Sequence, residues 1–294
     1  MAFRSHEDSP SSHVAVALTI AASDSGGGAG IQADLATFAA HGVYGASVLT
    51  AVTAQNTRGI LGVEPVSRTL LRLQMDAVFP DLRPAAVKIG MLYDSARVRE
   101  VARGLRLHGA RRVVLDPVLA AKDRSPLLDS PAAAVLSRVL FPLCDLVTPN
   151  RPEAEALSGI AIRTESDRRR AATVLAGFGA KAVLIKGGHG RSDTVDDLLF
   201  DGRTFRNFKH PRIATRARHG TGCTLSAAIA ARLALGANLA DAVARAIDYL
   251  QGALAAGMFP GRGWGVPGRF RPASPTPSKK TGTRARGRRT RPRR

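Results

Sequence analysis

A glycine-rich loop late in the chain carries the residues best suited to chemistry. The run His219-Gly220-Thr221-Gly222-Cys223 leads directly into an alanine-rich stretch that is typical of a helix. Glycines allow backbone N–H groups to converge on one point, and a helix N-terminus adds partial positive charge there. We therefore expect Gly220, Thr221 and Gly222 to bind a phosphoryl group, with Cys223 as the base that takes a proton from a substrate alcohol. The helix N-terminus is expected to lower the pKa of the thiol, although a capped helix with a buried cysteine explains the same segment.

Carboxylates follow two apolar runs that are typical of strands. Asn150 and Glu153, in TPNRPEAEAL, are spaced to share one face of a helical turn, where a carboxylate can order magnesium around ATP phosphates. A plain helix start with Asn150 as its N-cap is the alternative. Asp116 closes the run VVLD and is a second candidate metal ligand, or it forms a turn with Pro117.

An earlier glycine loop has the spacing of a dinucleotide-binding turn. Gly28 to Ala33 match G-x-G-x-x-A between a strand-like run and a helix-like run. That fingerprint also needs an acidic residue about 20 positions further on to hold the ribose. The stretch ASVLTAVTAQN contains none, and the next acid is Glu64. A dinucleotide-dependent oxidoreductase is therefore disfavoured.

The elements that must position these residues alternate along the chain. Apolar runs predict strands at 14–20, 46–53, 85–90, 111–116, 144–148 and 181–186, with helical stretches between them. A hairpin with Asp201-Gly202 at its turn and two helices, 222–235 and 238–256, complete the pattern. This order predicts an α/β fold with a mostly parallel sheet covered on both faces, which binds ligands at the carboxyl ends of its strands.

Composition indicates where the folded domain begins and ends. We expect one domain over residues 14–266, with disordered segments at 1–13 and 267–294, because the C-terminal stretch is rich in Arg, Pro and Gly and lacks apolar periodicity. Truncation before Pro267 is expected to leave catalysis unchanged. This basic tail either contacts nucleic acid or acidic surfaces, or is a solvated tail without a partner. Two cysteines and no long apolar run favour a cytoplasmic protein that does not enter a membrane.

Taken together, the motifs resemble the ribokinase-like superfamily, and specifically its hydroxymethylpyrimidine/phosphomethylpyrimidine kinase branch. The resemblance runs from about Ala17 to Gly265. It implies a three-layer α/β/α sandwich with a mostly parallel sheet, a homodimer, and ATP-dependent phosphorylation of a hydroxymethylpyrimidine and then of its monophosphate, on the route to thiamin. The motifs that carry it are LTIAASDSGGGAGIQADLATFAAHGVYGASVLTAVTAQNTRG, KIGML, VVLDPV, TPNRPEAEAL, VLIKGGH, HGTGCTLSAAIAA and GRGWG.

The resemblance also implies roles for individual residues. Cys223 stands where most ribokinase-like enzymes have an aspartate. Around the pyrimidine, Gln55 is expected to bind the aminopyrimidine edge, Met91 and Thr53 to line the ring pocket, and the loop around Gly28 to close over it. Asp24 and Asp34 are expected to order either the substrate hydroxyl or the loop, and for each a plain turn or helix cap is the alternative. The residues expected near ATP are Asn150, Lys186 and Lys122, and those expected near its Mg²⁺ are Glu153 and Asp116; Lys186 as a plain strand-end charge is the rival interpretation.

Three stretches depart from the family pattern. The family glycine after DPV is missing from Lys122–Ser125, Ala22 replaces a glycine, and Val266-Pro267-Gly268-Arg269 replaces Pro-x-x-His. The alternatives that stay open are a pyridoxal kinase or dual pyridoxal/pyrimidine kinase, and a non-catalytic protein of this fold that binds nucleic acid through its tail.

Overall fold

The predicted strands are neighbours in a single sheet. The computed structural model describes residues 14–120, 130–188, 190 and 192–269, and Lys122 therefore lies outside the described residues. The sheet has nine strands in the order β3-β2-β1-β4-β5-β6-β7-β8-β9. The parallel strands are β1 (Val16–Asp24), β2 (Tyr44–Gln55), β4 (Ala86–Ile89), β5 (Val113–Leu115), β6 (Leu146–Val147) and β7 (Val183–Ile185). The antiparallel strands are β3 (Ile60–Pro65), β8 (Thr194–Phe200) and β9 (Phe205–Pro211).

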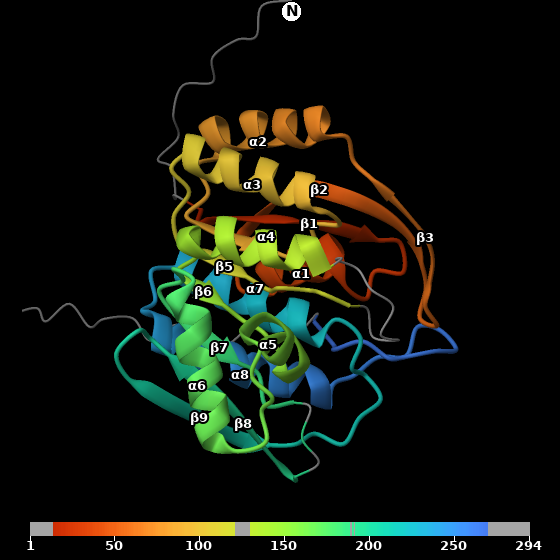
Figure 1. The fold of residues 1–294 in the computed structure, drawn as a ribbon. Helices are drawn as coiled ribbons and strands as arrows, with labels where there is room; N and C mark the ends of the chain where they lie inside the picture. The colour runs from red at the N-terminus through yellow and green to blue at the C-terminus, as the bar shows by residue number, and fades with distance from the viewer. Residues whose placement is uncertain (1–13, 121–129, 189, 191, 270–294) are drawn as a thin grey trace, which may run out of the picture.

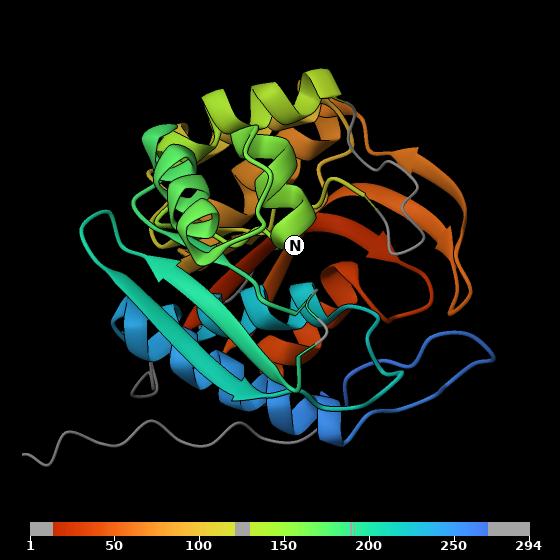
Figure 2. The same cartoon turned by 60° about the horizontal axis from the view of Figure 1, so that its bottom comes forward.

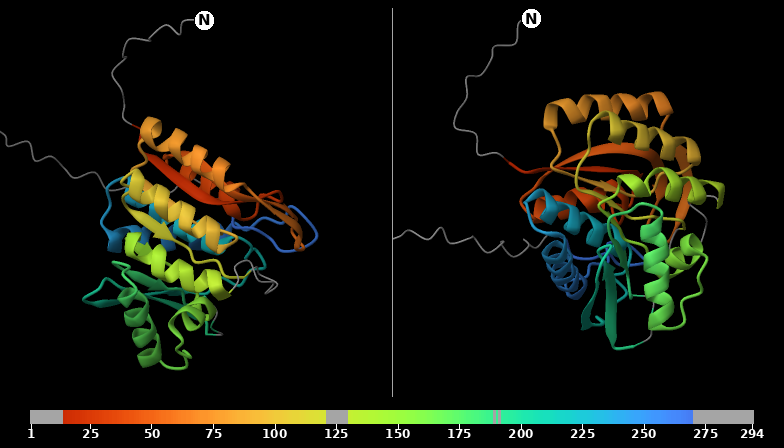
Figure 3. Two further views of the ribbon diagram at one scale, coloured as in Figure 1. Left: turned by 45° about the horizontal axis from the view of Figure 1, so that its top comes forward. Right: turned by 60° about the vertical axis from the view of Figure 1, so that its left-hand side comes forward.

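Helices cover both faces of this sheet, so the predicted three-layer α/β/α sandwich is confirmed (Figure 2). One face carries α1 (Gly30–Ala40), α7 (Thr221–Ala234) and α8 (Leu239–Ala255). The other carries α2 (Arg68–Leu82), α3 (Ser95–Leu107), α4 (Ser130–Val139), α5 (Arg151–Ser158) and α6 (Glu165–Gly177), with the short 3₁₀ helix η1 (Phe141–Leu143). Figure 3 shows α2, α3 and α4 side by side on this face. Because both faces are covered, the central strands are apolar on both sides.

Helix α7 lies close against the middle of the sheet. Its alanines at 227, 228, 230 and 231 have no exposed surface, and the helix contacts β1, β4 and β5. Small side chains allow this close approach, which explains how a chain with few aromatic residues fills its core. The N-terminus of α7 is thereby brought to the carboxyl ends of the parallel strands.

Several element boundaries differ from those predicted. β1 extends to Asp24 rather than ending at 20, and β3 was not predicted at all. β3 is an exposed edge strand in which Leu61 is 82% exposed, so its sequence lacks the alternation that burial of one face produces. The predicted hairpin is present, but its turn spans 201–204 instead of two residues, since the Asp201 carboxylate accepts hydrogen bonds from the N–H groups of Arg203 and Thr204.

After α8 the chain runs to the turn between β2 and β3, at the right of Figure 1. We call residues 257–269 the C-terminal strap. Met258 pairs with Val266, and the N–H of Trp264 donates to the carbonyl of Thr57 in the turn between β2 and β3 (Figure 1). The strap ends at Arg269, which is only 4% exposed. The expected disorder from 267 onward is therefore wrong for residues 267–269, and truncation before Pro267 would remove a buried side chain.

Within the described ranges, no helix combines the length and the apolar character needed to cross a membrane.

Candidate active site

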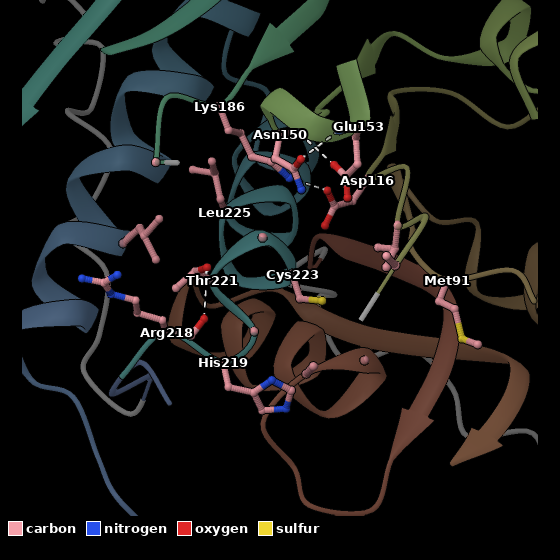
Figure 4. A pocket seen from close by; sticks show the side chains of 18 of the residues that line it. Met91, Asp116, Asn150, Glu153, Lys186, Arg218, His219, Thr221, Cys223 and Leu225 are labelled. Atoms are coloured by element: carbon pink, nitrogen blue, oxygen red, sulfur yellow. Dashed lines mark hydrogen bonds and ion pairs between the residues drawn. The ribbon is translucent and has the colours of Figure 1, made fainter. Parts of the chain in front are cut away.

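A cavity of about 1080 Å³ opens at the carboxyl ends of the parallel strands. Most of the predicted site residues line it, and Figure 4 shows several of them around one space. They are Asp24, Thr53, Gln55, Met91, Asp116, Asn150, Glu153, Lys186, Gly220, Thr221, Gly222 and Cys223. Gly28 and Asp34 are not in the wall of the cavity.

The N-terminus of α7 faces this cavity. Gly220 is its N-cap, with a φ of +78° that favours glycine, and no side chain caps the first turn. The first N–H groups of a helix have no partner within the helix, so here they are available to a ligand. Together with the helix dipole they make this end of the cavity suited to an anion, as the sequence predicts.

The Cys223 side chain points into the cavity, between the Asp116 group and His219 (Figure 4). Burial raises the pKa of its thiol, and this outweighs the lowering by the Lys88 ammonium and by a hydrogen bond from the Gly30 N–H. The negative charges of Asp34 and Asp116 raise the pKa further. The expectation of a lowered thiol pKa is therefore wrong, because it considered the helix N-terminus without the burial.

Lys88 and Asp34 form a fully buried ion pair beneath this thiol. The Lys88 Nζ lies 2.8 Å from Asp34 Oδ2, which also accepts a 2.6 Å hydrogen bond from the Thr19 hydroxyl. Asp34 is thus engaged by protein groups and does not reach the cavity wall, whereas Lys88 does. The predicted role of Asp34 in ordering the substrate hydroxyl is therefore not supported. Lys88 was missed; a lone lysine in the apolar run AAVKIG was the available signal.

Asp24 holds the first glycine loop closed. Its carboxylate accepts hydrogen bonds from the N–H groups of Gly26 and Ala29 at 2.8 Å, and lies 3.1 Å from His219 Nε2. Burial opposes ionisation, but the His219 and backbone hydrogen bonds lower the pKa of Asp24 overall. Asp24 was predicted to order either the substrate hydroxyl or the loop, and these contacts are with the loop and with His219.

His219 links this loop to Gln55 in the wall of the cavity. Its Nε2 also lies 3.2 Å from Gln55 Nε2. A Cβ on Gly28 would lie 2.2 Å from the His219 ring, so the loop and the imidazole pack without room for a side chain. His219 was not predicted as a site residue, although it directly precedes the phosphate-binding glycines.

Acidic and basic groups meet at the opposite end of the cavity. Lys186 Nζ lies 2.6 Å from Asp116 Oδ1. Glu153 and Asn150 form a capping box at the start of α5, where the Asn150 N–H donates to Glu153 Oε2. Burial raises the pKa of Glu153 to about 7, Asp116 adds to the rise, and Lys186 opposes it. The helix-start interpretation of Asn150 and Glu153 is therefore correct, and both residues also line the cavity.

These carboxylates suit a metal that is shared with a ligand. Among the described residues, no group of three or more His, Cys, Asp or Glu forms a complete metal site. Mg²⁺ commonly takes only one or two protein carboxylates, with water and substrate phosphates as its other ligands. Asp116 and Glu153 fit that donor set.

The cavity continues past Lys186 along an apolar wall. Gln251 Nε2 lies 2.9 Å from His210 Nδ1, and His210 Nε2 lies 3.1 Å from Asp197 Oδ2. The apolar residues of this part are Val195, Ile213, Leu225, Leu250 and Leu254. None of these residues was predicted. Leu225 lies in α7, inside a recognised motif, but the others come from β8, from β9 and the segment after it, and from α8, whose sequences contain no recognised motif.

Comparison with known proteins gives one consistent picture. Residues 24–267 match the family model described as phosphomethylpyrimidine kinase. The chain is 53% identical over 243 residues to the hydroxymethylpyrimidine/phosphomethylpyrimidine kinase of Rhizobium meliloti, covering 82% of this chain and 91% of that one.

Two solved structures share the fold. The phosphomethylpyrimidine kinase of Clostridium difficile is 41% identical, with a TM-score of 0.72 over 80% of this chain and 97% of that one. The pyridoxal kinase of Staphylococcus aureus, in complex with AMP-PCP and pyridoxal, is 30% identical, with a TM-score of 0.80 over 88% of this chain and 94% of that one.

The buried ion pair makes a first prediction. Lys88→Met leaves the Asp34 carboxylate buried without a cation, and we expect a loss of about 3–5 kcal/mol in the free energy of unfolding. In the variant the folded-state pKa of Asp34 lies above its unfolded value, so stability falls as pH rises, and the deficit is larger at pH 8 than at pH 5. Urea unfolding at both pH values measures this. Lys88→Met combined with Asp34→Asn should recover much of the loss, and a deficit that does not change with pH would contradict the assignment.

The raised pKa of Glu153 makes a second prediction. The folded protein keeps this carboxyl protonated up to about pH 7, whereas the unfolded chain releases the proton near its ordinary value. The folded state then binds more protons in this window, so the free energy of unfolding falls as pH rises through it. Glu153→Gln, which keeps an acceptor for the Asn150 N–H, should remove this part of the pH dependence, by on the order of 1–3 kcal/mol. Thermal unfolding of both proteins between pH 4.5 and 8 tests it; parallel curves would show that Glu153 is not the group responsible.

Proposed function

The chain belongs to the phosphomethylpyrimidine kinase family, and we propose that it transfers the γ-phosphoryl group of ATP to the hydroxymethyl group of 4-amino-5-hydroxymethyl-2-methylpyrimidine and then to the resulting monophosphate. The observation that carries this proposal is the position of Cys223. It lies at the uncapped N-terminus of α7 and lines the same cavity as Gln55 and Met91. A nucleophilic alcohol, a base and an anion site are thereby brought to one point.

The substrate end of the cavity offers matching chemistry for an aminopyrimidine. The Gln55 amide provides both a donor and an acceptor, which a ring nitrogen and its adjacent amino group require. Met91 supplies a polarisable apolar surface for the ring. The hydroxymethyl group then faces Cys223, and the loop held by Asp24 shields it from water.

Cys223 is the proposed general base. The hydroxymethyl oxygen gives its proton to the Cys223 thiolate as its bond to the γ-phosphorus forms, and the bond from that phosphorus to the β-phosphate oxygen breaks, so that ADP leaves. Because burial raises the pKa of the thiol, the thiolate is a strong base that is present in only a minor fraction at neutral pH. Turnover should therefore rise as pH increases above neutrality, with the Lys88 ammonium stabilising the thiolate.

The phosphates occupy the other end in this proposal. The N–H groups at the start of α7 hold the γ-phosphoryl group during transfer, and Lys186 and Asn150 contact the nucleotide phosphates. Asp116 and Glu153 hold Mg²⁺, which neutralises charge on the phosphates when it is bound. Lys122 remains a predicted phosphate contact. We further propose a homodimer, on the family resemblance alone, and a cytoplasmic location, on the low cysteine content; the nucleic-acid contact of the basic tail remains a prediction.

A pyridoxal kinase or dual activity is the second candidate. It is supported by the structural similarity to the Staphylococcus aureus enzyme that binds AMP-PCP and pyridoxal. Both substrates are substituted six-membered rings with a hydroxymethyl group, so the same base and anion site can serve either. The identity to a named pyrimidine kinase, 53%, is higher and favours the pyrimidine.

The experiment that tests the function is a coupled assay of ADP release with ATP and Mg²⁺. Hydroxymethylpyrimidine, its monophosphate and pyridoxal are offered as acceptors in parallel. We expect turnover with the two pyrimidines. Turnover with pyridoxal alone would replace the proposal by the second candidate, and no turnover with any acceptor would support the non-catalytic alternative.

The proposed base makes a specific kinetic prediction. Cys223→Ala should lower kcat by roughly 10²- to 10⁴-fold, the range expected for a general base, with little change in the dissociation constant of ADP. Steady-state kinetics and calorimetric titration with ADP measure the two quantities. The matched control is Cys144→Ala, because Cys144 is buried in the opposite core cluster and does not line the cavity. Near-normal kcat in Cys223→Ala would remove the base assignment.

A further inference from the structure

The last described side chain of the strap lies behind the phosphate-binding loop. Arg269 is 4% exposed, and its guanidinium contacts two segments that are far apart in the sequence. Its Nη2 donates a 2.6 Å hydrogen bond to the carbonyl of Gly28, in the loop that Asp24 closes. Its Nε donates a 2.8 Å hydrogen bond to the Thr224 hydroxyl, in the first turn of α7.

The same guanidinium approaches the carbonyls that precede α7. Nη2 lies 3.4 Å from the oxygen of His219 and 3.5 Å from that of Gly220. Gly220 also accepts hydrogen bonds from the N–H and the hydroxyl of Thr224. Carbonyls of both glycine-rich loops are therefore turned toward one buried cation.

This arrangement fixes which way the peptide N–H groups point. In a trans peptide the C=O of one residue and the N–H of the next point in opposite directions. Holding the Gly220 carbonyl on the helix side therefore directs the N–H of Thr221 toward the cavity that Thr221 lines. At Gly28 the peptide is held from both sides, because its carbonyl accepts from Arg269 and the next N–H, that of Ala29, donates to Asp24.

The atoms around Gly220 are packed too closely to admit a side chain there. A Cβ on Gly220 would lie 1.9 Å from the Gly28 carbonyl oxygen and 2.5 Å from Arg269 Nη2. The Arg269 backbone is anchored as well, since its carbonyl accepts a 3.0 Å hydrogen bond from the Tyr249 hydroxyl of α8. The guanidinium thus joins the two glycine-rich loops and α7 at a fixed separation.

We infer that Arg269 is a positioning residue for phosphoryl transfer, which aligns the N–H groups at the start of α7 with the loop that closes over the acceptor. This inference rests on the proposed kinase function for its kinetic consequence, but the alignment itself is a property of the chain. Arg269 does not line the cavity, so it acts through the Gly28 and Gly220 peptides. Its positive charge also lies near the Cys223 thiol and favours the thiolate.

The test compares full-length Arg269→Met, Arg269→Lys and wild type. Arg269→Met should lower kcat by roughly 10- to 100-fold, while the KM for ATP changes little; this is less than the roughly 10²- to 10³-fold loss when an oxyanion-hole donor is removed, because the N–H donors are misaligned rather than lost. Arg269→Lys keeps the charge but cannot donate to Gly28 and Thr224 together, so kcat should recover only in part. Equal kcat in wild type and Arg269→Met would overturn the inference.

A matched control separates alignment from general destabilisation. Arg97→Met removes another buried guanidinium that donates to a backbone carbonyl, that of Val66. Arg97 does not line the cavity. Both substitutions should lower the thermal unfolding temperature, but Arg97→Met should leave kcat unchanged. A parallel fall in kcat in Arg97→Met would show that loss of stability, not alignment, explains the effect.

A readout without substrate separates this inference from the proposed function. Iodoacetamide alkylation should report on Cys223, since Cys144 has no exposed surface. The alkylation rate at pH 8 should fall severalfold in Arg269→Met, take an intermediate value in Arg269→Lys, which keeps the charge but loses part of the alignment, and remain close to wild type in Arg97→Met. This result would stand even if no pyrimidine were phosphorylated, in which case only the proposed function fails; an unchanged alkylation rate in Arg269→Met would contradict the inference.

Discussion

A lysine and an aspartate without exposed surface have to neutralise each other, and the pair that does so here lies beneath the candidate site. Lys88 extends from β4 and Asp34 from α1, and Thr19 of β1 donates the second hydrogen bond to the carboxylate. Each charge alone would cost several kcal/mol to bury, so β1, β4 and α1 can pack only in the register that joins them. The same charges act on the Cys223 thiol, with Lys88 lowering its pKa and Asp34 raising it. The interaction that fixes the scaffold therefore also sets the electrostatics of the proposed base.

The rest of the site follows from where the parallel strands end. Alanines let α7 lie close to the sheet, so its N-terminus meets the strand ends at the cavity. The capping box at Asn150 and Glu153 serves two purposes, since it starts α5 and places a carboxylate beside Asp116 and Lys186. Structural and functional interpretations of such residues are therefore not exclusive, because the same two residues cap a helix and line the cavity.

The sequence allowed the order of the elements, the mostly parallel sheet and twelve of the residues that line the cavity to be predicted, because apolar runs and local motifs encode them. Edge strand β3 was missed since exposure removes its alternation. Lys88, His219 and Arg269 were missed for a different reason: their partners lie 54, 195 and 241 residues away, and no local pattern announces such contacts. The thiol pKa was predicted in the wrong direction because a helix N-terminus is visible in sequence and burial is not. Arg269 was assigned to a disordered tail on composition, although its guanidinium is hydrogen-bonded to Gly28, His219 and Thr224.

The central claim is that one cavity brings a pyrimidine alcohol, the Cys223 thiol and the N-terminus of α7 together for phosphoryl transfer. A crystal structure with hydroxymethylpyrimidine, Mg²⁺ and a non-hydrolysable ATP analogue tests it most directly. The account predicts the hydroxymethyl oxygen within hydrogen-bonding distance of Cys223 Sγ, with the terminal phosphate on the N–H groups that follow Gly220. A pyrimidine bound away from Gln55 and Cys223, or a terminal phosphate outside the α7 loop, would contradict it.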